Sequence, residues 1–330
     1  MVRSDELIRR LGIKVPVIAG PMYPCSNPEL VAAVSRAGAL GVIQPVSLTY
    51  VHGYSFKEGL AKVLQEAGQR PVGLNLLIET SSKAYLEQNK KWLQEALDQG
   101  VRFFITALGD PSWVIQWTKP AGALVFHDVT DPKFAAKAMK AGVDGLICVN
   151  NRAGGHAGTM SPQELFASLK DTGLPLICAG GVGSEKDFRE ALKMGYCGVS
   201  MGTRFIATEE CTAHGDYKKA ILDAMPEDII MTKKITGVPV AVINTDFMKK
   251  RGAQTGFWAD LLLGNKQTKH LARMVYTLRS MWQLKRSNKQ GSSYKDYFQA
   301  GKSVGGIQKI EKVSAIIERF EQEFRRLDQT

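Results

Sequence analysis

Between residue 15 and about residue 208, short apolar runs rich in β-branched side chains alternate with longer segments of helical periodicity. The runs are continuously apolar, as expected of parallel strands that are covered on both faces. Eight runs are predicted as strands, at 15–20, 39–44, 70–77, 101–108, 122–128, 143–150, 174–181 and 197–202. Helices are predicted between them, among them 28–37, 82–99, 132–141, 162–170 and 185–194.

Residues at the helix ends support this pattern. Asn27-Pro28 and Ser184-Glu185 are typical helix starts, with a capping side chain before the first turn. Glycines follow several predicted helices at the C-terminal side, at Gly38, Gly100, Gly142 and Gly195. Eight strand–helix units in about 190 residues predict a (β/α)8 TIM barrel. A doubly wound open sheet is the alternative, and the lack of an acidic ribose-binding residue after the first unit weighs against it.

The pattern changes after Thr208, where Met, Lys and Arg become frequent and strand-like runs almost cease. Only the stretch GVPVAVINT, at 237–245, reads as a strand. The sequence therefore predicts a barrel formed by residues 1–213 and 305–330, with a mainly helical subdomain, 214–304, inserted after strand 8. The tail at 307–327 is an amphipathic helix that is expected to return to the barrel.

Composition narrows the class of protein. The chain is 44% hydrophobic and has neither a secretory signal pattern nor an apolar run of about 20 residues, so a cytoplasmic protein without a membrane span is expected. Its five cysteines are widely spaced, which predicts buried free thiols in a reducing compartment. The five histidines show no clustered spacing, and no metal site is expected.

The net charge of +11 is concentrated in one stretch. Residues 265–304 contain nine Lys or Arg residues and a single acid, Asp296. A solvated basic face is one interpretation. Attraction for phosphorylated cofactors, acidic carrier proteins or anionic surfaces is the other. Nucleic acid is not expected as a partner, because no recognisable nucleic-acid-binding motif accompanies the charge.

The candidate chemistry lies after the predicted strands, because barrel active sites collect at the C-terminal ends of the strands. Gly180-Gly181 follows strand 7, and Gly202-Thr203 follows strand 8. Glycine lets backbone N–H groups approach a phosphate, and a following helix N-terminus supplies a favourable dipole. This pair of loops is the usual phosphate site of such barrels. A tight turn without a ligand is the alternative for either loop alone.

His156 is the candidate acid or base. It follows strand 6 in a loop with Gly154, Gly155 and Gly158, where little side-chain packing accounts for a histidine. Histidine titrates near neutral pH and is the natural proton carrier at such a position. His127, at the end of strand 5, is expected to form a hydrogen-bonding wall of the site.

These motifs together resemble the nitronate monooxygenase family, formerly the 2-nitropropane dioxygenases, whose superfamily includes flavin-type enoyl-acyl-carrier-protein reductases and NADH:quinone reductases. The resemblance spans residues 12 to about 215 in motif order. It is carried by Pro21-Met22, Gly73-x-Asn75, Ala153-Gly154-Gly155-His156-x-Gly158, Ala179-Gly180-Gly181 and Met201-Gly202-Thr203-Arg204-Phe205.

The resemblance implies non-covalent FMN at the barrel mouth, with His156 at the catalytic position. The phosphate would be held by Gly180, Gly181, Gly202 and Thr203. The ring and ribityl chain would be lined by Met22 (through its backbone), Asn75, His127 and Gly155. The chain departs from the family at Arg152, in the loop where members commonly carry an acid or glutamine shortly before the Gly-Gly-His. A cation there favours an anionic substrate or points outward to solvent.

Oxidation of alkyl nitronates by O2 is the favoured function, with His156 as base or hydrogen-bond donor. The alternative is NAD(P)H-dependent reduction of a quinone or an enoyl thioester on acyl carrier protein. A flavin-binding protein without turnover is the second alternative, and a titratable group in a glycine loop argues against it. The expected partner is a small-molecule substrate, with a homodimer left open.

Overall fold

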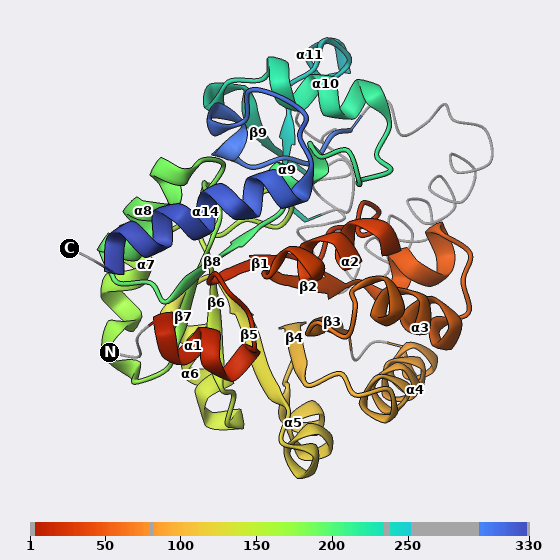
Figure 1. The fold of residues 1–330 in the computed structure, drawn as a ribbon. Coiled ribbons are helices and arrows are strands. Elements are labelled where there is room, and N and C mark those ends of the chain that lie inside the picture. Colours follow the sequence, from red (N-terminus) through yellow and green to blue (C-terminus); the bar gives the residue numbers. More distant parts are fainter. Residues whose placement is uncertain (1–3, 80–81, 234–237, 252–296, 329–330) are drawn as a thin grey trace, which may run out of the picture.

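The computed structural model describes residues 4–79, 82–233, 238–251 and 297–328 (Figure 1). Eight parallel strands form a closed barrel in sequential order, with β8 pairing β1. All eight predicted strands are present, and the closed ring excludes the open-sheet alternative. The strands are β1 Val17–Ala19, β2 Leu40–Ile43, β3 Val72–Ile78, β4 Phe103–Leu108, β5 Leu124–Val129, β6 Gly145–Val149, β7 Leu176–Ala179 and β8 Gly198–Met201.

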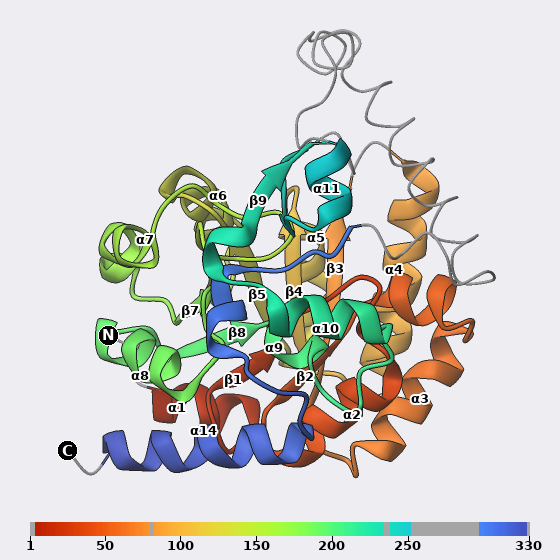
Figure 2. The same ribbon diagram turned by 90° about the horizontal axis from the view of Figure 1, so that it is seen from above.

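Helices surround the strands (Figures 1 and 2). Three helices begin and end at the predicted residues, because an N-terminal cap or proline and a left-handed C-terminal glycine define both ends. The α-helices are α1 Ser4–Leu11, α2 Pro28–Ala37, α3 Phe56–Glu66, α4 Lys83–Asp98, α5 Ser112–Thr118, α6 Pro132–Ala141, α7 Pro162–Leu169, α8 Glu185–Met194, α9 Thr203–Ile206, α10 Gly215–Asp223, α11 Asp246–Arg251 and α14 Val313–Asp328. Shorter helical turns are η1 Ser47–Val51, η2 Lys119–Ala121, η3 Lys170–Thr172, η4 Pro226–Asp228 and η5 Lys302–Gly306.

Side chains alternate between the barrel interior and the helix layer along each strand. The interior is one cluster of buried side chains, which includes Phe103 and Phe126 with ring centroids 5.1 Å apart. Their neighbours along the same strands, Phe104 and Val125, belong instead to a cluster shared with the outer helices. Because this alternation is regular, a residue's position in its strand shows which way its side chain points.

The amino-terminal end of the barrel is closed by α1. Leu7 and Leu11 of this helix belong to the interior cluster. A Cβ added at Gly198, the first residue of β8, would lie 3.2 Å from Cδ2 of Leu7. The open end of the barrel is therefore the opposite one, where the strands end.

The last helix, α14, packs against α2 and α8, as the sequence analysis expected. Phe320 lies 5.1 Å from Phe188 of α8 between ring centroids, and Arg189 of α8 donates to Glu323 at 2.6 Å. Since α9 after β8 has only four residues, α14 occupies the place of the eighth outer helix (Figure 1). The chain leaves the barrel after β8 and returns to complete its ring of helices.

A buried ion pair joins this return to the end of β8. Arg204 is 3% exposed, and its Nη2 donates to Glu311 at 2.9 Å. Arg319 of α14 donates to both oxygens of Glu311 at 2.9 Å. Glu311 thus connects the strand-8 loop with the last helix.

The described part of the predicted insertion contains both helices and strands. β9 (Ile229–Thr232) pairs in antiparallel fashion with β10 (Val240–Ile243), next to α10 and α11. β10 is the strand-like stretch noted in the sequence, whereas β9 was not predicted. The predicted boundaries of this subdomain remain a prediction, and residues 252–296, with most of the basic stretch, lie outside the described residues.

All five cysteines are buried and unpaired, which confirms the prediction of free thiols. Burial raises the pKa of Cys178 to about 12, so this thiol stays protonated. The cysteines therefore act as small apolar residues of the core.

Candidate active site

The loops after β6 and β7 are joined at the open end of the barrel. Asn150 is fully buried and donates from Nδ2 to the carbonyl of Gly180 at 3.1 Å. Its Oδ1 accepts from the backbone N–H of Arg152 at 2.8 Å. Gly180 has a φ of 118°, and a Cβ there would lie 2.5 Å from the backbone nitrogen of Ala153. Only glycine fits between the two loops at this position.

Gly181 continues this contact. Its φ is 84°, and a Cβ there would lie 2.7 Å from Nε and 3.0 Å from Cδ of Arg152. The arginine side chain therefore lies across Gly181. A Cβ at Gly183 would meet the carbonyl oxygen of Ser303 at 2.1 Å, so the returning segment at 301–306 also packs on this loop.

The start of α8 follows, and its first amides are already bonded. The N–H groups of Gly183 and Ser184 donate to Oδ2 of Asp187 at 3.1 and 3.0 Å. Ser184 in turn accepts from the N–H of Asp187, which completes a capping box. These two amides are satisfied within the helix, so a phosphate at this loop would have to be met at Gly180 and Gly181, the residues predicted for it.

The loops after β1 and β8 also meet. The side chain of Met22 lies 3.5 Å from the position of a Cβ at Gly202. The N–H of Met22 donates to Oγ of Ser26 at 2.9 Å. Thr203 is buried, and its Oγ1 accepts from the N–H of Gly301 at 3.1 Å. Its own hydroxyl proton can still be donated to a ligand.

Asn75 faces the barrel interior, on the same face of β3 as Gly73. It is 3% exposed, and its Nδ2 donates to the carbonyl of Ile105 in β4 at 3.2 Å. This bond fixes the amide near the middle of the barrel, where its Oδ1 is left to accept.

His127 is not brought into the interior. It follows the inward-facing Phe126, so its side chain points to the helix layer, where Nδ1 lies 2.8 Å from Oγ1 of Thr106. Burial lowers its pKa to about 4. The next residue, Asp128, faces the interior at the end of β5, and burial raises its pKa to about 7. His127 was named from the sequence and Asp128 was not, because an unbroken apolar run does not reveal which of its side chains face inward.

His156 lies in the loop after β6, which is fixed on both sides. Gly155, with a φ of 67°, exchanges backbone hydrogen bonds of 3.3 and 2.7 Å with Ala241 of β10. A Cβ at Gly154 would lie 2.9 Å from the backbone of Gly301. The loop is thus held between the insertion and the returning segment. The ring of His156 is exposed, yet the surrounding chain removes enough water to lower its pKa below 6.5.

A single region therefore contains the loops after β1, β6, β7 and β8. The residues present there are compatible with a phosphate-bearing flavin, because Gly180 and Gly181 follow β7 in left-handed conformations, the side chain of Arg152 lies across Gly181, and Thr203 keeps a hydroxyl proton to donate. In the described ranges no group of three His, Cys, Asp or Glu side chains is placed to hold a metal ion. None of the described helices combines the length and apolar composition needed to cross a bilayer.

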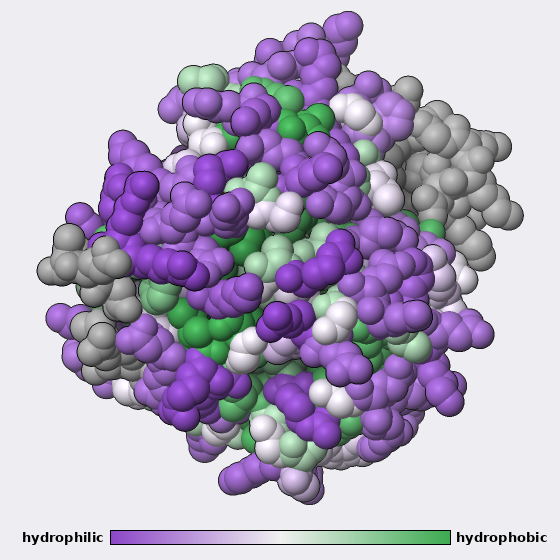
Figure 3. Space-filling view, viewed as in Figure 1, coloured by the Kyte–Doolittle hydropathy of each residue, from purple (hydrophilic) through white to green (hydrophobic). Residues whose placement is uncertain are grey.

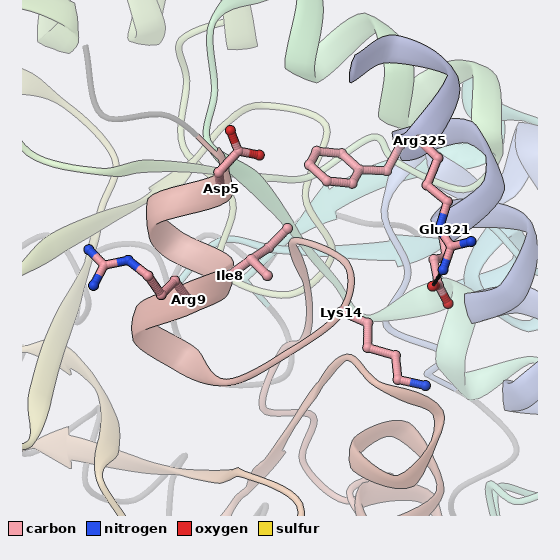
Figure 4. A pocket seen from close by; sticks show the side chains of 7 residues that line it. Asp5, Ile8, Arg9, Lys14, Glu321 and Arg325 are labelled. Atoms are coloured by element: carbon pink, nitrogen blue, oxygen red, sulfur yellow. Dashed lines mark hydrogen bonds and ion pairs between the residues drawn. The ribbon is translucent and has the colours of Figure 1, made fainter. Parts of the chain in front are cut away.

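A cavity of about 480 Å³ lies away from this region, between α1 and α14 (Figure 4). The surface around it is mostly hydrophilic, with apolar side chains gathered between the two helices (Figure 3). Its lining residues are Asp5, Ile8, Arg9, Lys14, Glu321, Phe324 and Arg325. Because α1 closes the amino-terminal end of the barrel, this cavity has no contact with the strand-end loops.

A closed parallel barrel with glycine loops after its last two strands and a histidine at its mouth has the architecture of a barrel enzyme. Comparison with known proteins gives the family. The profile of the nitronate monooxygenase family matches residues 4–323. The chain belongs to the nitronate monooxygenase family, which confirms the prediction of a flavin-type oxidoreductase.

Three similar proteins illustrate the range of relatives. A (3aS,4S,5R,7aS)-5-hydroxy-7a-methyl-1-oxo-octahydro-1H-indene-4-carboxyl-CoA dehydrogenase of Rhodococcus jostii (strain RHA1) is 28% identical over 73% of this chain, and the match spans 66% of that relative. A nitronate monooxygenase of Pseudomonas aeruginosa is 26% identical over 71% of this chain and 78% of its own length. The structure of FabK from Thermotoga maritima superposes with a TM-score of 0.78 at 27% identity, covering 100% of this chain and 98% of that one.

Proposed function

We propose that this protein binds FMN at the open end of the barrel and oxidises alkyl nitronates with O2. The observation that carries the proposal is the position of His156, on a loop that is fixed at Gly155 and lies beside the glycines of the β7 loop. Membership of the nitronate monooxygenase family supports the reaction, and the similarity to the Pseudomonas enzyme supports it further.

The phosphate of FMN would be held by Gly180, Gly181, Gly202 and Thr203. Met22 and Gly155 would line the ring and ribityl chain, and the interior side chains of Asn75 and Asp128 would face them. His127 is omitted from these contacts because its ring faces the helix layer. When bound, FMN supplies the electron transfer between the nitronate and oxygen.

His156 would handle the proton and the charge of the substrate. Since its pKa is lowered, the imidazole is neutral at pH 7, with one nitrogen that accepts a proton and one that donates. The accepting nitrogen can take a proton from the carbon of a nitroalkane. The donating nitrogen can hydrogen-bond an oxygen of the nitronate and orient it. The overall reaction balances when two nitronates and one O2 give two carbonyl compounds and two nitrite ions.

Nitrite release tests the proposal. The purified protein should be yellow, and nitronate with O2 should yield nitrite. His156→Ala should retain the flavin spectrum and, with a neutral nitroalkane as substrate, lose about 10²- to 10⁴-fold in turnover, the usual contribution of general acid–base help. His214→Asn is the matched control, because His214 is an exposed N-cap of α10 and asparagine preserves the cap. A colourless protein that cannot be reconstituted with FMN would refute the flavin, and an unchanged rate in His156→Ala would refute the catalytic role.

A reductase is the second candidate, because FabK covers the whole chain at a TM-score of 0.78 and the Rhodococcus relative is named as a carboxyl-CoA dehydrogenase. In this case NAD(P)H reduces the flavin, and a quinone or an enoyl thioester on acyl carrier protein accepts the electrons. Anaerobic mixing separates the two functions. Rapid bleaching by NADH or NADPH favours the reductase, whereas bleaching only by a nitronate favours the monooxygenase.

A further inference from the structure

The loop that carries His156 also places a cation at the glycines of the β7 loop. Arg152 lies two residues before Gly154, and its Nε and Cδ lie within 3.0 Å of the position that a Cβ of Gly181 would take. Two bonds hold its backbone there, since its N–H donates to Asn150 and its carbonyl accepts from Lys302 at 2.9 Å. The direction of the side chain therefore follows from a loop that is fixed at both ends.

The charge balance of this loop favours a role for that cation. The carboxylate of Asp187 bonds the N–H groups of Gly183 and Ser184, so it both occupies donors and places a negative charge at the start of α8. A phosphate monoester carries a charge of about −1.5 to −2 at pH 7. Such a group beside Gly181 needs a positive charge that the helix start does not supply.

Arg152 is suited to meet this need. Its side chain is partly buried, and within the described ranges no hydrogen bond or ion pair engages its guanidinium. Most arginines that contact the barrel ends are already bonded, as Arg204 is to Glu311. A guanidinium presents paired N–H donors that match two phosphate oxygens, and it remains charged at any physiological pH.

We propose that Arg152 binds the phosphate of FMN and makes this protein select the phosphorylated flavin over riboflavin. The inference rests on the proposed function, because it assigns a role at the same cofactor site. Arg152 would supply the positive charge that, at other phosphate sites, comes from a helix N-terminus whose N–H groups are not already bonded. It would act in cofactor binding and would not contact the reacting atoms.

The test compares two ligands that differ only in the phosphate. FMN and riboflavin are titrated into flavin-free protein, and quenching of flavin fluorescence gives each Kd. Arg152→Gln should weaken FMN binding by about 10- to 100-fold, the range of a charge-assisted bidentate contact, and leave the Kd of riboflavin unchanged. Arg152→Lys should lose less, because the charge remains while the paired donors are lost. Lys302→Gln is the control, since Lys302 is an exposed cation whose backbone bonds Arg152.

Each result has a definite meaning. An unchanged Kd for FMN in Arg152→Gln overturns the inference. Equal weakening of both flavins also overturns it, because Arg152 would then only support the loop. If Lys302→Gln weakens FMN binding as much as Arg152→Gln does, the effect comes from the overall positive potential of this surface, and the specific contact of Arg152 is overturned. If the wild-type protein binds neither FMN nor riboflavin, the proposed function itself fails. The three results above overturn only the role of Arg152, because in each of them the wild-type protein still binds FMN.

Discussion

Asp128 is a carboxyl group that faces the barrel interior at the end of β5, and its titration should control stability above pH 5. Burial raises its pKa from 3.8 to about 7 in the folded protein. A group whose pKa is raised on folding stabilises fully below its unfolded pKa and loses that contribution as the pH rises through its folded pKa. Wild-type protein should therefore lose stability between about pH 4 and pH 8.

The magnitude follows from the shift. Three pKa units at about 1.36 kcal/mol each give at most about 4 kcal/mol above pH 8, and less than half of this is present at pH 5. Asp128→Asn has the same shape without the charge, so it removes this pH dependence. The difference in unfolding free energy between variant and wild type should grow by about 2–3 kcal/mol from pH 5 to pH 8.5.

Urea unfolding at both pH values, followed by the fluorescence of the five tryptophans, measures this difference. An amide at this position can also change stability by a constant amount, and the comparison across pH cancels that amount. Asp223→Asn is the control, because Asp223 is an exposed acid on α10. A difference that stays the same at both pH values would refute the reasoning, since the carboxylate of Asp128 would then be as well solvated in the folded protein as in the unfolded chain.

Three further predictions test other parts of the structure. Gly183→Ala should destabilise the protein by about 3 kcal/mol in urea, because its Cβ would meet a backbone oxygen at 2.1 Å, while Gly215→Ala, with nothing within 4 Å, should be nearly neutral. Arg204→Met should lower the unfolding free energy by about 3 kcal/mol, because it leaves Glu311 partly unpaired, and adding Glu311→Gln should recover part of the loss in a double-mutant cycle. In a pH profile with a neutral nitroalkane as substrate, kcat/KM should fall on the acid side with a midpoint below 6.5, since protonated His156 cannot accept the carbon proton; a profile that is flat there would remove His156 as the base.

The strands could be predicted because a barrel strand is buried on both faces, and two-sided burial produces an unbroken apolar run. The same fact explains why His127 was chosen over Asp128. A run such as LVFHDV has no polar alternation from which its inward face could be read, and only the packing of Phe126 against Phe103 in the folded barrel defines it. The strand end at which these two polar residues lie was predictable, whereas the direction of each side chain was not.

Contacts between distant loops were also beyond the sequence. The glycines at 180–181 indicated a close approach, yet nothing in the chain showed that Arg152 would be the group approaching. The short strand Ile229–Thr232 carries no signal of its own, because its pairing with β10 is what makes it a strand. By contrast, α14 was predictable from its amphipathic pattern alone, since one face of the helix had to be buried.

The hydrogen bond between Gly301 and Thr203 has a consequence for how such barrels diversify. It joins two points that are about a hundred residues apart in the chain, so both ends of the long connection from β8 to α14 are fixed on the barrel. The entropy of closing a loop changes only with the logarithm of its length, and halving or doubling it alters the free energy by about 0.6 kcal/mol. Loop closure alone therefore sets little cost on the length of this connection, whereas buried side chains such as Phe205, Tyr217 and Phe298 hold it to the core of the barrel. A chimaera that exchanges part of this connection must therefore keep those buried side chains, the pairing of Ala241 with Gly155 and the two pinned ends.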